Sequence, residues 1–90
     1  MESKKNRKVR VENIRMSSLR EKFSLTQEQL ANEVGVTQSM ISHIEAGKRD
    51  TGKEIEISIV SFFNKKLQEV GEAKISVEWL FYEQIYDLQS

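Results

Sequence analysis

Residues 26–46 read TQEQLANEVGVTQSMISHIEA, and the first half of this stretch predicts a short helix with both of its ends marked. Thr26 is followed three residues later by Gln29, a capping-box pattern that satisfies free backbone N–H groups at a helix start. Gly35 marks the end of the helix, because a residue without a Cβ atom adopts a left-handed backbone at no steric cost.

The second half of the stretch predicts another helix that starts almost at once. Thr37 is its N-cap candidate, the helix covers residues 38–46, and Gly47 ends it. Two short helices joined only by residues 35–37 must cross steeply. We therefore expect a helix-turn-helix centred on residues 26–46.

The second of these helices has two different sides. At about 100° per residue, Ile41 and Ile44 fall on one side and are expected to be buried. The opposite side carries uncharged polar groups, whereas a face that only meets water usually carries Lys and Glu. Amide, hydroxyl and imidazole groups suit the edges of DNA bases; the alternative interpretation is that they cap the helix and face water. The candidate base-reading residues are Gln38, Ser39, Ser42 and His43.

Candidate phosphate-binding residues flank the two helices. Lys48 and Arg49 follow the second helix directly, where they can hold phosphates. Gln27 stands at the start of the first helix, where an amide side chain and free backbone N–H groups suit an anion.

Working outward, the rest of the chain predicts three more helices and no strand. The first covers residues 10–23. Another opens with a second capping-box pattern from Thr51 to Glu54, and the last covers about residues 76–89 with Ser76 as its cap. We therefore expect an all-α fold, a compact bundle of five helices.

Charge is distributed unevenly along the chain although the formal net charge is zero. Residues 1–53 hold eleven basic and seven acidic side chains, whereas residues 54–90 hold three basic and seven acidic ones. One end of a small domain can thus face a polyanion. Residues 1–9 are polar and basic and are expected to form a flexible arm, and residues 10–90 a single domain.

Composition argues against several classes of protein. There is no cysteine and one histidine, so no thiolate nucleophile and no zinc site is expected. The four glycines form no phosphate-binding loop. We expect neither an enzyme nor a cofactor or metal. The longest run of bulky apolar residues, 79–82, is far too short to span a bilayer, so a cytoplasmic location is expected.

The pattern T-Q-x-x-L-A from Thr26, V-G-V from Val34 and I-x-x-I-E-x-G-K from Ile41 resembles the phage repressor/Cro-type, XRE-like helix-turn-helix family. The likeness covers roughly residues 12–67. It implies a lambda-repressor-like bundle in a bacterial or phage-encoded transcriptional regulator. It further implies a repressor that binds a near-palindromic operator in double-stranded DNA as a homodimer.

The resemblance also implies roles for single residues. Gln27 would touch phosphate and brace Gln38, which would hydrogen-bond a base, adenine being the natural partner of an amide. Arg20 and Glu45 match positions that form a structural ion pair between the first and third helices. Ser39, Ser42 and His43 would reach bases or backbone, and Thr37, Lys48 and Arg49 would hold phosphates.

Apolar residues near the C-terminus, within residues 79–88, leave a second function open. They offer more apolar surface than one short helix can hide against so small a core, although they could simply pack on the chain's own helices. We expect part of this surface to form a dimer interface, which half-site spacing requires. The alternative is an antitoxin-like or anti-repressor-like module that binds a protein partner through this helix. The residues concerned are Trp79, Leu80, Phe81 and Ile85.

Overall fold

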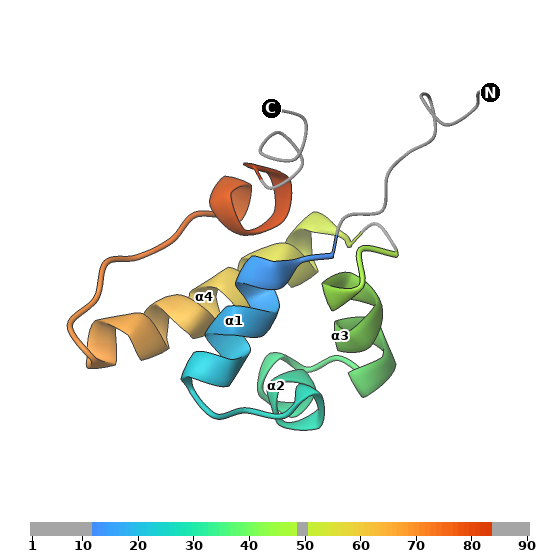
Figure 1. Ribbon diagram of the computed structural model, residues 1–90, viewed down its shortest axis with the longest axis horizontal. Coiled ribbons are helices and arrows are strands. Elements are labelled where there is room, and N and C mark those ends of the chain that lie inside the picture. The colour runs from blue at the N-terminus through green and yellow to red at the C-terminus, as the bar shows by residue number, and fades with distance from the viewer. Residues whose placement is uncertain (1–11, 49–50, 84–90) are drawn as a thin grey trace.

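The computed structural model describes residues 12–48 and 51–83, and within them the fold is all-α (Figure 1). The expected arm at 1–9, Arg49 and Ile85 lie outside the described residues. This part of the chain contains no helix with the length and apolar character needed to cross a membrane. Its elements are α1 (Ile14–Lys22), α2 (Gln27–Val34), α3 (Gln38–Glu45), α4 (Lys53–Glu69) and η2 (Glu78–Tyr82), the last a π-helical turn. The expected lambda-repressor-like architecture of five helices is confirmed.

Every helix contributes to one hydrophobic core. Phe63 of α4 is fully buried at its centre and stacks on Phe23, with 6.5 Å between the ring centroids. In Figure 1 α1 crosses in front of α4, α2 lies below α1, and α3 lies to the right of both. The buried apolar residues are Met16, Leu19, Leu30, Ala31, Ile41, Ile44, Ile59, Val60, Phe63, Leu67 and Leu80.

The turn between α2 and α3 forms as the sequence predicts. Thr26 and Gln29 make both hydrogen bonds of a capping box, at 3.0 and 2.9 Å. Gly35 has φ +79°, and its N–H donates to the carbonyl of Ala31. The Thr37 hydroxyl accepts from Met40 N at 3.1 Å and starts α3. The short turn between α2 and α3 thus forms because the residues at its two ends cap the two helices.

Two helix starts differ from the sequence prediction. α1 begins at Ile14 instead of residue 10, because the Asn13 side chain accepts a hydrogen bond from Met16 N and so caps the helix. α4 begins at Lys53 with Gly52 as its N-cap and without a side-chain cap. The expected capping box starting at Thr51 is therefore wrong, because Thr51 precedes the N-cap position.

The chain returns from the end of α4 to η2 as an extended segment (Figure 1). The Asn64 side chain holds this segment, donating to Ile75 O at 3.1 Å and accepting from Ile75 N at 2.8 Å. The Ser76 hydroxyl then accepts from Trp79 N at 3.0 Å. At the far end, the Tyr82 hydroxyl donates to the buried carboxylate of Glu56. The segment between the last two helices is thus fixed to α4.

Candidate nucleic-acid interface

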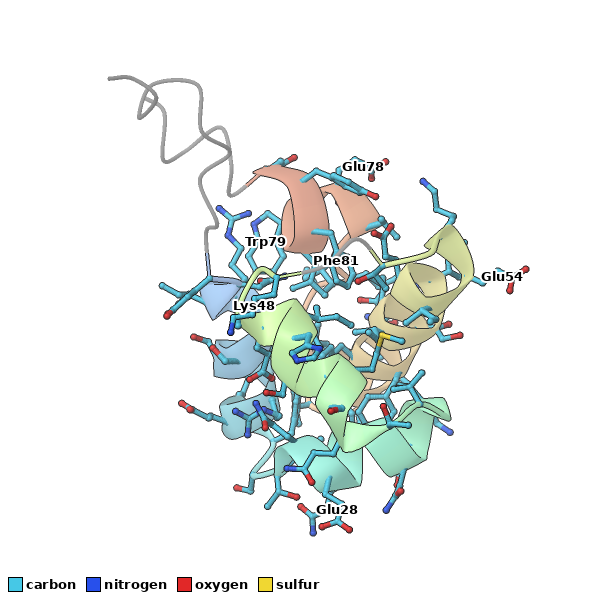
Figure 2. The ribbon with its side chains drawn as sticks, turned by 90° about the vertical axis from the view of Figure 1, so that its right-hand side faces the viewer. Glu28, Lys48, Glu54, Glu78, Trp79 and Phe81 are labelled. Carbon is cyan, nitrogen blue, oxygen red and sulfur yellow. The ribbon has the colours of Figure 1, made fainter. Side chains whose placement is uncertain are left out.

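The two sides of α3 have the character that periodicity predicts. Ile41 and Ile44 are buried against the other helices, with 0% and 4% of their surface exposed. On the opposite side Gln38, Ser39 and His43 are exposed. The list of candidate base-reading residues is completed by Ser42, which is half-buried. Figure 2 looks onto this side of α3, and no other described helix crosses in front of it.

Both ends of α3 carry groups that can meet phosphate. The Thr37 hydroxyl accepts from Met40 N, so its own hydrogen remains able to bind an anion. At the other end Gly47 has φ +72°, and Lys48 N donates to His43 O at 2.9 Å. This exit places the exposed Lys48 directly beyond the last turn of α3 (Figure 2).

The carboxylate of Glu45, on the inner side of α3, bonds side chains from α1 and α2. Glu45 Oε2 accepts from Arg20 Nε at 2.7 Å, and Oε1 accepts from Arg20 Nη2 at 3.1 Å. The side chains of Arg20 and Glu45 are only 14% and 9% exposed, so water screens this ion pair little. The hydrogen bond to Glu45 raises the pKa of Arg20 above its usual value, against a smaller opposing effect of burial. The pair between α1 and α3 fixes the inner side of α3.

Gln27 is held by the same carboxylate. Its Nε2 donates to Glu45 Oε1 at 3.0 Å, and the residue is half-buried. Between the described side chains of Gln27 and Gln38 there is no hydrogen bond, so the expected brace is replaced by one to Glu45. The physical reason is that a carboxylate is a stronger acceptor than an amide. Gln38 itself is exposed.

The acidic side chains labelled in Figure 2 lie around α3 and not on it. Glu28 lies at the outer edge of α2, Glu54 in the first turn of α4, and Glu78 on η2. The basic side chain labelled in this view, Lys48, lies beside α3. This arrangement keeps the labelled carboxylates away from the polar face of α3.

Sequence reasoning missed one polar residue of this region. Asn13 is 8% exposed, and its backbone N–H donates to Glu45 O, at the end of α3, at 2.7 Å. Its side chain caps α1 through Met16 N and donates to Leu80 O at 2.9 Å. The available signal was an Asn directly before an apolar helical stretch, which is a typical N-cap pattern.

The expected dimer residues are divided by the structure. Leu80 is fully buried in the core of its own chain, so it is not available to a second protomer and its assignment to an interface is wrong. Trp79 and Phe81 are half-buried and keep an exposed part. Arg15 covers one face of the Trp79 ring, with 4.4 Å from its guanidinium carbon to the ring centroid. The exposed part of Trp79 therefore lies beside a charged side chain.

Comparison with known proteins agrees with this geometry. The family model described as helix-turn-helix matches residues 16–70, which is more than half of the chain. An "Uncharacterized HTH-type transcriptional regulator" of Archaeoglobus fulgidus is 36% identical over 56 residues, covering 62% of this chain and 79% of the relative. A protein of Methanocaldococcus jannaschii with the same description is 38% identical over 47 residues, covering 52% of this chain and 71% of the relative.

These two relatives are archaeal and give no support to the expected bacterial or phage origin. No solved structure matches the chain. The matched segment contains α2, α3, their turn and the whole of α4. The chain belongs to the helix-turn-helix family.

Proposed function

We propose that this protein is a sequence-specific transcriptional regulator that inserts α3 into the major groove of double-stranded DNA. One observation carries the proposal: α3 presents uncharged hydrogen-bonding side chains outward while Ile41 and Ile44 anchor it inside. The major groove admits an α-helix, and each base pair offers a distinct pattern of donors and acceptors there. The names of the two archaeal relatives support a role in transcription.

The proposed roles follow from exposure and chemistry. Gln38, exposed in the first turn of α3, reads a base with its amide, and adenine offers the matching donor and acceptor. Gln27 contributes its backbone N–H at the start of α2, because its side chain is engaged with Glu45. The further base-reading residues are Ser39, Ser42 and His43, and the further phosphate contacts are Thr37, Lys48 and, outside the described residues, Arg49.

The finer proposal is a repressor that binds a near-palindromic operator as a homodimer. Helix-turn-helix dimers place their recognition helices in successive major grooves about one helical turn apart. The half-buried Trp79 and Phe81 support an interface between protomers. The same two residues support the second candidate, a module that acts mainly by binding another protein.

In vitro selection tests the proposal and its alternative together. Random duplexes are selected on the full chain, and native mass spectrometry counts the chains bound to the selected duplex. We expect an enriched near-palindromic site with two chains bound. Enrichment of a single half-site with one chain bound would contradict the dimer, and the absence of any enriched site would favour the protein-binding module.

Replacing Gln38 by Ala is expected to relax the choice of one base in each half-site. Loss of a bidentate amide contact lowers discrimination at that base by about 1–3 kcal/mol. Competition binding with duplexes that vary each position in turn measures the effect. Equal weakening of selected and random DNA would contradict base reading by Gln38. Gln68→Ala is the control and should leave base preference unchanged, because Gln68 is an exposed amide on α4 that donates to Glu72 O just beyond the end of that helix.

Replacing Lys48 by Ala is expected to weaken binding to all DNA alike. A lost phosphate contact removes one released counterion, so the slope of log K against log salt flattens by about one unit per protomer. Titrations at several salt concentrations measure this slope. Lys65→Ala on the exposed face of α4 is the matched control and should leave the slope unchanged. A change of base preference without a change of slope would contradict the assignment of Lys48.

A further inference from the structure

Asn13 lies where three helices meet. Its backbone N–H donates to Glu45 O at the end of α3, and its side-chain oxygen accepts from Met16 N in α1. Its side-chain nitrogen donates to Leu80 O in η2 at 2.9 Å. With 8% of its surface exposed, Asn13 makes these bonds largely shielded from water, where a lost partner is costly.

The position of η2 is thus fixed from α1. Arg15 donates to Trp79 O at 2.8 Å, so two side chains that are two residues apart, Asn13 and Arg15, hold two consecutive carbonyls of η2. Arg15 also stacks on the Trp79 ring. A shift of η2 therefore strains the Asn13 side chain, and the same residue carries the backbone bond to α3.

The bond to Glu45 leads toward the polar face of α3. The carbonyl that accepts from Asn13 and the carboxylate that holds Gln27 and Arg20 belong to the same residue. A displacement of the Glu45 backbone therefore moves the partner of the Gln27 amide at the start of α2. Contiguous packed and hydrogen-bonded groups of this kind carry coupling between distant sites when both ends bias them.

We propose that Asn13 is a positioning residue for DNA recognition: through it, the docking of η2 sets the position of the C-terminal end of α3. The inference rests on the proposed function.

Two substitutions separate this role from simple helix capping. Asp is as good an N-cap as Asn, so Asn13→Asp keeps the acceptor for Met16 N, removes the donor to Leu80 O and adds a negative charge there. Asn13→Ser keeps a capping oxygen without the reach to η2 and without a new charge. Asn64→Asp is the matched control, because it removes the corresponding amide donor to Ile75 O, in a bond that links α4 to the segment after it.

The readout is the NMR spectrum of the folded protein without DNA, recorded well below each variant's unfolding midpoint. We expect both Asn13 variants to shift the side-chain amide of Gln27 and the Nε–H of Arg20, neither of which touches Asn13. The control should shift signals near Ile75 and leave these two unchanged. If the role of Asn13 were purely structural, its substitution would lower the unfolding midpoint and leave these two signals in place. Unchanged Gln27 and Arg20 signals in both Asn13 variants, or equal shifts in the control, would overturn the proposal.

DNA binding supplies the second arm. Affinity for the selected duplex should fall about fivefold or more in both Asn13 variants, the lower end of typical coupling between sites, and should be unchanged in Asn64→Asp. Equal affinity of all three variants would overturn the role in recognition. If the unaltered protein binds no duplex at all, the proposed function fails, while the spectra still decide whether η2 and Glu45 are coupled.

Discussion

Replacing Glu45 by Ala should destabilise the protein by about 3–5 kcal/mol, the cost typical of removing one partner from a buried ion pair. The substitution leaves the Arg20 guanidinium, 14% exposed, without the carboxylate that binds it at two points. It also leaves the half-buried amide of Gln27 without its acceptor. The free energy of unfolding of a native domain is about 5–15 kcal/mol in total, so the loss is a large fraction of it. Urea unfolding followed by circular dichroism measures it.

A double-mutant cycle isolates the pair from other effects of the substitution. Arg20→Ala combined with Glu45→Ala should cost less than the two single losses added, by about 0.5–3 kcal/mol, because the second substitution removes the orphaned charge. The control is Lys22→Ala, which breaks an exposed ion pair with Glu72 and should cost about 0–1 kcal/mol. A loss as small as the control's for Glu45→Ala would contradict the buried character of the pair.

Replacing Leu80 by Ala should cost about 2–5 kcal/mol, because a fully buried leucine leaves a cavity that its neighbours fill only in part. The residue is the contribution of η2 to the core, so its loss should also loosen the C-terminal segment. The measurement is again urea unfolding, performed at two protein concentrations far apart. We expect the loss to be the same at both, because the cavity forms within one chain.

Ile57→Ala is the control for this second substitution. Ile57 is 51% exposed on α4, and its truncation should change stability by no more than about 0.5 kcal/mol. If Leu80 instead belonged to a dimer interface, Leu80→Ala would weaken self-association and its effect would depend on protein concentration. That result would contradict the packing described here.

The helix-turn-helix could be predicted because the residues that end its helices act on their near neighbours in the sequence. Thr26, Gly35 and Thr37 each act within three to five residues of their own position, so a capping box, a left-handed exit and a second cap suffice to place α2 and α3. The inner and outer sides of α3 follow from its periodicity alone, with Ile41 and Ile44 inside.

The remaining misses involve partners distant in sequence. Leu80 looked like surplus apolar surface because nothing near it in the sequence reveals that it packs on the core. The bond of Asn13 to Leu80 O spans 67 residues, and no local pattern announces it. Gln27 is a similar case, since its acceptor Glu45 lies 18 residues away and competes with the expected neighbour Gln38. Local signals thus predict where the helices lie, whereas contacts between residues distant in sequence decide which polar groups pair.

The most direct test of the recognition surface is an NMR titration of the isotope-labelled protein with the selected duplex. We predict that the largest changes fall on the backbone amides of Gln38, Ser39, Ser42 and His43 and on the side-chain amide of Gln38. A duplex of the same composition in scrambled order should perturb Lys48 while changing the Gln38 side chain far less. Changes concentrated on the exposed face of α4 or on η2, with α3 unaffected, would contradict the account.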